Sequence, residues 1–264
     1  MDTIEVRGLE IAFERQGTGP PLVLLHGFVG HSREWRRQID DLSDEYTVVA
    51  WDAPGAGRST VPPETFRLPD YADCLAAFIA ALGLTRPHIA GVSFGGALAL
   101  ELYGRHPTVP ASLVLAGAYA GWAGSLTQEV TGQRLQATLQ AADAPSEQRV
   151  GSMIPGMFSG SPAAAAVEEF RGIMSEIHPA GLRAMARSLA EADLRDVLPR
   201  IGVPTLLLYG DQDRRASLAV AEDMHARIPA SRLVVMQAVG HMSSVEAPEP
   251  FNAEVRSFLK SVRP

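Results

Sequence analysis

The 264-residue sequence is poor in cysteine, in clustered positive charge and in long apolar segments. Its one cysteine, Cys74, excludes an intrachain disulfide, and its place inside a helical pattern favours a buried thiol and a reducing compartment. Scattered Lys and Arg with a net charge of −7 argue against binding to nucleic acid or to an anionic membrane surface. Because the chain has no apolar run of about 18 residues and no charged N-terminal region followed by an apolar one, we expect neither a membrane span nor a signal peptide. We therefore expect a cytoplasmic protein with small-molecule partners, and we leave open whether it forms a homo-oligomer.

Several ligand-binding motifs are also missing. The chain has no Gly-Lys-Ser/Thr phosphate loop, and the Gly-x-Gly at Gly55 and Gly57 lacks the third glycine of a dinucleotide fingerprint. It has no His-Glu-x-x-His and no Cys/His cluster of the kind that holds zinc. We therefore expect neither a cofactor nor a metal.

Short apolar runs bounded by turn residues alternate with helical patterns along most of the chain. Such runs are typical of strands buried on both faces of a parallel sheet, and the alternation indicates helices on both sides of it. Residues 3–7 and 10–15 alternate in polarity around Gly8-Leu9, which predicts an antiparallel hairpin. The predicted fold class is therefore α/β, with a mostly parallel central sheet. Its predicted strands are residues 22–26, 46–51, 86–90, 113–117, 204–209 and 232–236.

Residues 119–195 interrupt this alternation. Ala, Gln, Glu, Met and Arg dominate there, prolines 145, 155, 162 and 179 break the helical stretches, and no strand pattern occurs. The segment is too long to be a bare loop inside a compact domain. We therefore predict a core formed by residues 1–118 and 196–264, with a helical cap, residues 119–195, inserted into it.

A serine stands between a predicted strand and a predicted helix, in Gly91-Val92-Ser93-Phe94-Gly95-Gly96. Gly-x-Ser-x-Gly in this setting is the nucleophile elbow, in which the glycines relieve crowding around a strained serine. A serine nucleophile needs a base, and the base needs an acid that orients it. Asp213 and His241 also follow predicted strands, so all three side chains are expected at the same edge of the sheet. Asp211 is a second candidate for the acid, and we choose Asp213 because a residue directly after Gly210 is still leaving its strand.

His26-Gly27-Phe28 ends an earlier strand at the same edge. The backbone N–H groups of Phe28 and Phe94 are therefore predicted to form an oxyanion hole beside Ser93. His26 is interpreted as a brace for this loop, and Asp52 as a hydrogen-bonded turn residue.

These segments resemble the α/β-hydrolase superfamily over nearly the whole chain. The resemblance rests on HGF at His26, DAPGAGRS from Asp52, GVSFGG around Ser93, GDQD from Gly210 and GHMSSVEAPEPF from Gly240. Within the superfamily the chain looks most like 3-oxoadipate enol-lactonases, through ADLRDVLPRIGVPTLLLYGDQD and HMSSVEAPEPF. The resemblance implies a Ser-His-Asp hydrolase that cleaves a carboxylic ester or lactone through an acyl-enzyme, with a cap that shapes the pocket. We name Trp35, Trp122, Met157, Phe158 and Met242 as candidate pocket residues; for Trp35 and Trp122, core packing is the alternative.

Other functions remain open for such a chain. The same triad serves C–C bond hydrolases of ring-cleavage products, which usually carry Trp directly after the catalytic His, where this chain has Met242. Cofactor-free perhydrolysis is a further reaction of related enzymes. Some proteins of this fold are small-molecule receptors that keep the triad. Relatives with an Asp nucleophile are excluded because Ser93 occupies that position.

Overall fold

The computed structural model describes residues 1–262, so the last two residues of the predicted core, 263–264, lie outside the described part. Eight strands form one sheet in the order β1-β2-β4-β3-β5-β6-β7-β8. The hairpin of β1 and β2 is antiparallel and joins β4 in antiparallel register, whereas the other neighbours are parallel. The predicted hairpin and the mostly parallel sheet are thus confirmed. In chain order the strands are β1 (Asp2–Val6), β2 (Leu9–Gln16), β3 (Pro21–Leu25), β4 (Thr47–Trp51), β5 (His88–Val92), β6 (Ser112–Ala116), β7 (Thr205–Gly210) and β8 (Ser231–Met236).

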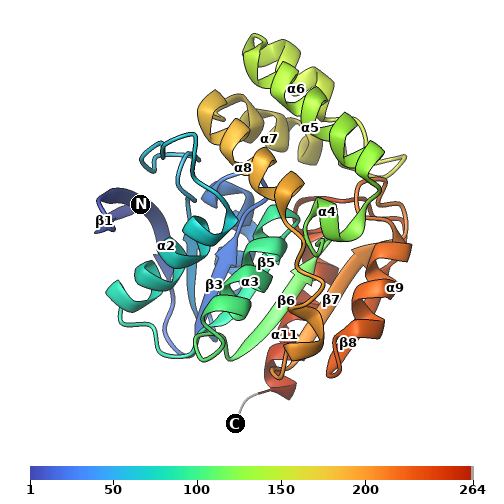
Figure 1. The fold of residues 1–264 in the computed structure, drawn as a ribbon. Coiled ribbons are helices and arrows are strands. Elements are labelled where there is room, and N and C mark those ends of the chain that lie inside the picture. Colours follow the sequence, from blue (N-terminus) through green and yellow to red (C-terminus); the bar gives the residue numbers. More distant parts are fainter. Residues whose placement is uncertain (263–264) are drawn as a thin grey trace.

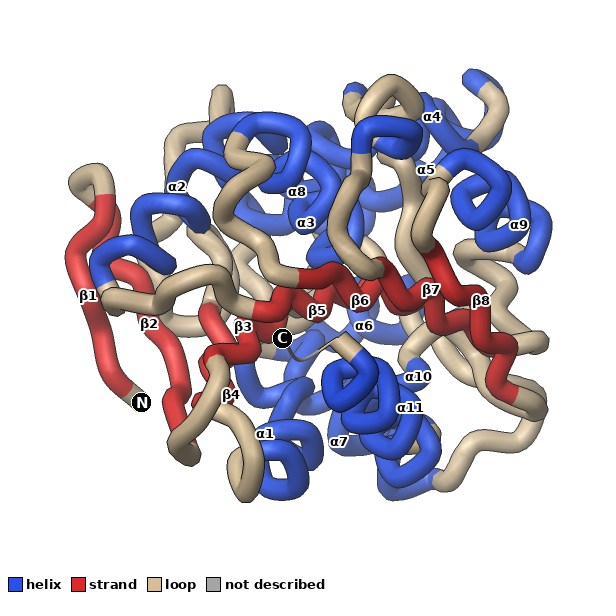
Figure 2. Tube along the Cα trace, turned by 90° about the horizontal axis from the view of Figure 1, so that it is seen from below, coloured by secondary structure: helices blue, strands red, loops and turns tan. Residues whose placement is uncertain are grey.

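The central strands bury both of their faces. In β3, Leu22 and Leu24 belong to one apolar cluster, whereas Val23 and Leu25 belong to the other, because successive side chains of a strand point to opposite faces. Figure 2 shows the sheet between two helical layers, with α2 (Leu68–Ala81), α3 (Phe94–Arg105) and α9 (Leu218–Arg227) on one face. On the other face lie α1 (Arg36–Leu42) and α11 (Pro248–Ser261). Short helices η1 (Ser32–Trp35), η2 (Leu198–Arg200) and α10 (Ser243–Glu246) complete the core.

Between β6 and β7 the chain forms helices and loops but no strand. Before η2 the helices are α4 (Trp122–Ser125), α5 (Gln128–Asp143), α6 (Ser146–Met153), α7 (Ala164–Ser175) and α8 (Pro179–Glu191). Figure 1 shows α5 to α8 gathered at one end of the sheet. The prolines account for the boundaries: Pro145 is the N-cap of α6, and Pro179 is the first residue of α8, where the missing N–H of proline leaves no helical hydrogen bond unmade. We refer to residues 119–195 as the cap segment.

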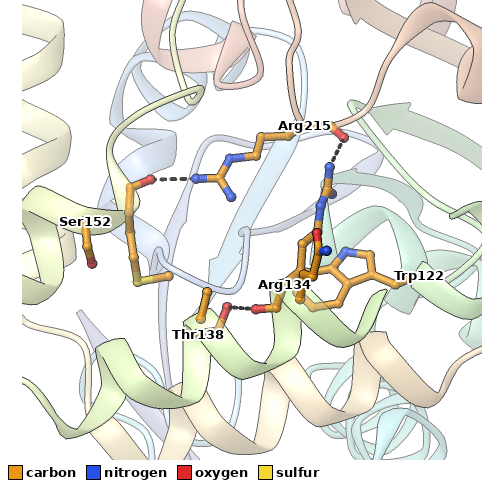
Figure 3. Close-up of a pocket in the computed structure, with 8 residues that line it drawn as sticks. Trp122, Arg134, Thr138, Ser152 and Arg215 are labelled. Carbon is orange, nitrogen blue, oxygen red and sulfur yellow. Dashed lines mark hydrogen bonds between the residues drawn. The ribbon is translucent and has the colours of Figure 1, made fainter. Parts of the chain in front are cut away.

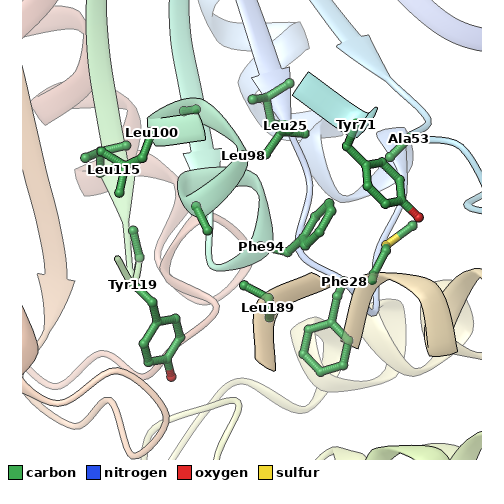
Figure 4. Close-up of a cluster of buried hydrophobic side chains, with 14 of the residues drawn as sticks. Leu25, Phe28, Ala53, Tyr71, Phe94, Leu98, Leu100, Leu115, Tyr119 and Leu189 are labelled. Atoms are coloured by element: carbon green, nitrogen blue, oxygen red, sulfur yellow. The ribbon is translucent and has the colours of Figure 1, made fainter. Parts of the chain in front are cut away.

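The cap segment packs on the core through a shared apolar cluster. Leu189 of α8 lies near Phe94 of α3 and Phe28 of the loop after β3 (Figure 4). At the base of the segment its two ends meet, because Leu194 donates a backbone hydrogen bond of 2.9 Å to Ala120. The helices of the cap segment therefore lie at the end of the sheet where β5 leads into α3.

Candidate active site

Ser93 stands at a strained corner between β5 and α3. Its φ of 52° lies in the left-handed region, which non-glycine residues rarely adopt. The strand hydrogen bond from the Ser93 N–H to the Ala116 carbonyl, 2.9 Å, and the start of α3 at the next residue impose this conformation. Strain of this kind costs roughly 1–3 kcal/mol and persists only where the surroundings enforce it. The sequence thus forms the sharp strand-to-helix turn that its elbow motif predicts.

The glycines around Ser93 allow the turn to pack closely. A Cβ atom added at Gly95 would lie 2.1 Å from the carbonyl oxygen of Leu25, the last residue of β3. One added at Gly91 would lie 2.3 Å from the carbonyl carbon of Gly95. Only glycine fits these positions, so the start of α3 can approach the end of β3.

His241 and Asp213 form a buried pair at the same sheet edge. Nδ1 of His241 is 2.8 Å from Oδ2 of Asp213, and the two residues are 3% and 8% exposed. The other oxygen, Oδ1, accepts hydrogen bonds from the backbone N–H groups of Arg215 (2.7 Å) and Ala216 (2.8 Å). These two donors hold the carboxylate in place. Because a carboxylate can only accept hydrogen bonds, Nδ1 of His241 carries the proton of this contact. In the neutral imidazole, this contact leaves Nε2 as the ring nitrogen that can accept a proton.

Asp211 lies elsewhere. It is exposed, and its Oδ1 accepts a bond of 3.3 Å from the backbone N–H of Val239. Of the two acids that the sequence offers, Asp213 is the one in contact with His241.

The loop that follows β3 lies against the elbow. A Cβ atom added at Gly27 would be 3.9 Å from the Cβ of Ser93, so Gly27, which precedes Phe28 in the chain, lies close to the serine. The ring of Phe28 packs edge-on against Trp122 at 6.0 Å, and that of Phe94 packs edge-on against Tyr71 at 5.3 Å. The side chains of Phe28 and Phe94 are thus both held by aromatic partners.

His26 and Asp52 hold this loop in place. Nε2 of His26 accepts a bond of 2.9 Å from the Ala53 N–H, so Nδ1 carries the proton and donates to the Gly27 carbonyl at 2.7 Å. Burial lowers the pKa of His26 to about 4, which keeps the ring neutral. Asp52 accepts backbone bonds from Ser32 (2.8 Å) and Arg58 (2.9 Å). Both residues therefore make the structural contacts that their interpretation implied.

Glu34 was not foreseen from the sequence. It is 3% exposed, and its Oε1 accepts a bond of 3.2 Å from the Gly27 N–H, while Oε2 is buried with no partner in the described residues. Burial raises the pKa of Glu34 to about 8. A carboxylic acid that is neutral at pH 7 thus lies beneath the loop that carries Phe28. Nothing in the local sequence distinguishes it from an ordinary exposed helical glutamate.

Residues 157–159 of the cap segment contact the His241 loop directly. The Met242 N–H donates to the Met157 carbonyl at 2.9 Å, and a Cβ atom added at Gly240 would lie 2.3 Å from the carbonyl carbon of Phe158. The carboxylate of Glu246 accepts bonds from the N–H groups of Ser159 (3.1 Å) and Gly240 (2.8 Å), and so links the two loops. Met157, Phe158 and Met242 are all buried, and the ring of Phe158 packs edge-on against Phe170 at 5.8 Å.

Of the remaining candidate pocket residues, Trp122 lines a cavity and Trp35 does not. Trp122 forms part of the wall of a cavity of about 270 Å³ between the cap segment and the loop that carries Arg215 (Figure 3). Trp35 is 0% exposed and packs against Phe251 at 6.1 Å between their ring centroids, within the cluster on the α1 and α11 face. Of the two alternatives left open for Trp35, core packing is the one that the structure shows, because the residue is fully buried in this cluster.

Tyr119 is a second residue that sequence reasoning missed. Its ring centroid is 6.4 Å from that of His241, and its hydroxyl accepts a bond of 3.0 Å from Arg134. A signal was available, because Tyr119 closely follows β6 at the sheet edge where Ser93, Asp213 and His241 gather.

Two further observations concern the described residues 1–262. Within them, no three His, Cys, Asp or Glu side chains are grouped so that they could hold a metal ion. No helix among them combines the length and the apolar character that crossing a bilayer requires.

Known proteins resemble the chain along nearly its full length. It is 31% identical over 94% of its residues to the dihydrolipoyllysine-residue acetyltransferase component of the acetoin cleaving system of Pseudomonas putida, of which it spans 66%. It is 26% identical over 98% of its residues to 3-oxoadipate enol-lactonase 2 of Acinetobacter baylyi, and covers 96% of that protein. A solved structure of a thermophilic esterase from Thermogutta terrifontis superposes with a TM-score of 0.93 at 29% identity, over 100% of both chains.

The family described as alpha/beta hydrolase fold matches residues 20–164 and 178–248. The match includes the elbow, the strand ends that carry Asp213 and His241, and most of the cap segment. With the strand order and the strained serine described above, it confirms the predicted fold class and the resemblance on which that prediction drew. The chain belongs to the α/β-hydrolase fold family.

Proposed function

We propose that the protein is a serine hydrolase that cleaves a carboxylic ester or lactone of a small organic molecule. In this proposal Ser93 is the nucleophile, His241 the base and Asp213 the residue that orients His241. The observation that carries it is the buried contact of 2.8 Å between Nδ1 of His241 and Oδ2 of Asp213, at the edge where Ser93 is held with φ 52°. The similarity to an esterase and to an enol-lactonase supports this choice of bond.

The first half of the reaction forms an acyl-enzyme. Nε2 of His241 takes the proton of the Ser93 hydroxyl as Oγ attacks the carbonyl carbon of the substrate. The carbonyl oxygen becomes an oxyanion and accepts hydrogen bonds from the N–H groups of Phe28 and Phe94. Each such donor is commonly worth about 3–4 kcal/mol in the barrier. The bond to the leaving oxygen then breaks, and that oxygen takes the proton from His241.

Water completes the reaction. His241 removes a proton from a water molecule, whose oxygen attacks the acyl carbon, and the Ser93 oxygen leaves and is reprotonated by His241. With an ester substrate the alcohol has already departed, whereas with a lactone the leaving oxygen stays attached to the acyl chain. The product is an acid in both cases, and the enzyme returns to its starting state without a cofactor.

The test is the change of Ser93 to Ala. Since the turn depends on the glycines and on packing, Ser93→Ala should fold normally and lose on the order of a million-fold in kcat on activated esters. Ser175→Ala, at an exposed serine of α7, is the matched control and should retain wild-type turnover. Sustained turnover by the wild type, rather than one burst followed by a stable adduct, separates an enzyme from a receptor. A folded Ser93→Ala variant that keeps more than a few per cent of the activity would refute the assignment.

A further inference from the structure

The carboxyl group of Glu34 lies inside the turn that carries Phe28. A hydrogen bond of 3.0 Å from the Gly30 N–H to the Gly27 carbonyl closes this turn. A Cβ atom added at Gly30 would lie 1.8 Å from Oε2 of Glu34 and 2.9 Å from its carboxyl carbon, so only glycine leaves room for the carboxyl group there. Since Glu34 is 3% exposed, the loop rather than solvent surrounds its carboxyl group.

Hydrogen bonds hold both peptide groups of Gly27. Its N–H donates to Oε1 of Glu34 at 3.2 Å. Its carbonyl accepts from Nδ1 of His26 at 2.7 Å and from the Gly30 N–H. Because a trans peptide is planar, the direction of the Gly27 carbonyl sets that of the Phe28 N–H, which the proposed function assigns to the oxyanion hole. Glycine has no Cβ atom to restrict its backbone, so these hydrogen bonds are needed to fix the orientation.

The immediate surroundings of Glu34 favour a neutral carboxyl group. Oε2 is buried and has no hydrogen-bond partner within residues 1–262, and Oε1 has only the Gly27 N–H. A carboxylate in this place would be a buried charge with a single donor, which is costly. The neutral acid avoids that cost and still accepts the hydrogen bond from Gly27.

The neighbouring elements offer Glu34 no cation. Helix η1, which carries Glu34, packs against β3, β4, α1, α7 and α10. The two strands have no titratable side chain, and His26 and Asp52, which follow them, are bonded to backbone groups. Glu246 of α10 accepts backbone hydrogen bonds from two loops, and burial lowers the pKa of His31, directly before η1. The charged side chains of α1 and α7 are exposed or half-buried.

We propose that Glu34 is a positioning residue for the oxyanion hole and that it acts in its protonated form. The inference rests on the proposed function and adds a residue to its machinery. As an acid, Glu34 holds the Gly27 N–H without bringing a charge to the loop. As a carboxylate, it would place an unpaired negative charge beside the peptide that stabilises the oxyanion, and the two negative charges would repel each other.

The sign of the pH effect follows from this arrangement. Burial raises the pKa of Glu34 to about 8, so the acid predominates below pH 8 and the carboxylate above it. The value of kcat should therefore fall as the pH rises above about 8. Protonation of His241 at low pH lowers kcat as well, but that loss does not involve Glu34.

The first test measures kcat on 4-nitrophenyl acetate from pH 6 to 9.5, with the spontaneous rate subtracted and folding checked by circular dichroism at each pH. Glu34→Gln keeps an oxygen for the Gly27 N–H but cannot ionise. The ratio of wild-type kcat to Glu34→Gln kcat should be roughly tenfold to thirtyfold lower at pH 9.5 than at pH 6. KM should change little in either protein, because the oxyanion forms only after the substrate has bound.

Glu249→Gln, at an exposed position of α11, is the matched control and should follow the wild-type profile. If Glu34 served only the stability of the fold, Glu34→Gln would leave the shape of the kcat profile unchanged. Parallel profiles of the folded wild type and Glu34→Gln would therefore overturn the inference.

A second variant removes the acceptor of the Gly27 N–H. At pH 7, Glu34→Ala should lose roughly a hundredfold in kcat, whereas Glu34→Gln should stay within about threefold of the wild type. Wild-type kcat in a folded Glu34→Ala protein would count against the positioning role. If Glu34→Ala does not fold, the profiles of the wild type and Glu34→Gln still decide the question.

Nuclear magnetic resonance tests the protonation of Glu34 without turnover. In Ser93→Ala protein labelled with 13C-glutamate, the carboxyl carbon signal that disappears in Glu34→Gln should titrate with a midpoint of about 8. A midpoint near 4.5, the ordinary value, would contradict the protonated form. If Ser93→Ala is inactive while the two kcat profiles are parallel, the proposed function stands and the role of Glu34 is rejected. Full activity of Ser93→Ala would instead reject the proposed function, and the inference with it.

Discussion

At the scale of single residues, the choice between Asp211 and Asp213 shows what a carboxylate must do beside His241. We expect Asp213→Asn to lower kcat on an activated ester by roughly ten thousand-fold, because the amide preserves the shape but favours the wrong imidazole tautomer. Asp211→Asn should affect mainly stability, since Asp211 is exposed and its side chain contacts the Val239 N–H at 3.3 Å. Both variants are compared at pH 7 to 8 after circular dichroism shows that they are folded. The reverse order of activities would transfer the orienting role to Asp211.

Glu34 provides a prediction about pH. Its pKa rises from 4.5 to about 8 in the folded protein because burial disfavours the charged form. Between these values the folded state holds a proton that the unfolded state has released, so the stabilisation is complete below pH 4.5 and is lost as the pH rises to about 8. Glu34→Gln removes this dependence and keeps an oxygen for the Gly27 N–H.

The measurement is urea unfolding of both proteins at pH 5, 6, 7 and 8. The free energy of unfolding of the wild type should fall relative to that of Glu34→Gln, by up to about 1.4 kcal/mol per pH unit. Glu249→Gln, at an exposed position of α11, should run parallel to the wild type. A constant difference between the wild type and Glu34→Gln would mean that Glu34 is ionised throughout.

Residues at strand ends were predictable, whereas partners brought together by tertiary packing were not. Ser93, Asp213 and His241 follow apolar runs, and the carboxyl ends of parallel strands meet at one edge of a sheet, so the order of elements along the chain is enough to group them. Glu34 is distinguished only by its burial, which no local pattern shows. The hydrogen bond from Arg134 to the Arg215 carbonyl joins two segments that are about eighty residues apart in the sequence. Trp35 stayed open between pocket and core for a related reason, since no local pattern tells which cluster a buried indole joins.

At the scale of elements, helix boundaries followed from local chemistry. Proline cannot donate a backbone hydrogen bond and clashes with the preceding turn, so each break predicted in the cap segment lies at or close beside a helix end. What the sequence did not indicate is how residues 157–159 return to the His241 loop. That approach depends on Gly240 and Glu246, which lie far from the cap segment in the sequence.

Gly240 provides the element-scale prediction. Gly240→Ala would place a Cβ atom 2.3 Å from the carbonyl carbon of Phe158 and 2.5 Å from the Ser159 nitrogen, so one of the two loops must shift. We expect a loss of stability of roughly 1–3 kcal/mol. Because His241 is the next residue, kcat should fall on the order of a hundredfold. Gly132→Ala in α5 is the control, since nothing lies within 4 Å of its added Cβ atom, and it should be neutral or stabilising by about 1 kcal/mol. Equal behaviour of the two variants in melting and turnover assays would show that the contact between the loops is unimportant.

At the scale of the whole molecule, the cap segment and the core share one apolar cluster. That cluster includes Leu25 and Phe94 from the core together with Phe170, Leu182 and Leu189 from the cap segment. Since removal of either part would expose the apolar surface of the other, the two should lose their structure together. We therefore expect that the cap segment, although inserted between β6 and β7, does not unfold independently of the core.

The three tryptophans allow this cooperativity to be measured, because Trp122 lies in the cap segment whereas Trp35 and Trp51 lie in the core. In a Trp35→Phe, Trp51→Phe protein, fluorescence reports on the cap segment alone, and in Trp122→Phe it reports on the core alone. Within each variant the urea midpoint from fluorescence should coincide with the midpoint from far-ultraviolet circular dichroism, which follows the helices of both parts. The comparison is made inside one protein, so the destabilisation caused by the substitutions cancels. A fluorescence midpoint for Trp122 clearly below the circular dichroism midpoint would show that the cap segment melts first. The shared cluster would then be too weak to couple the cap segment to the sheet.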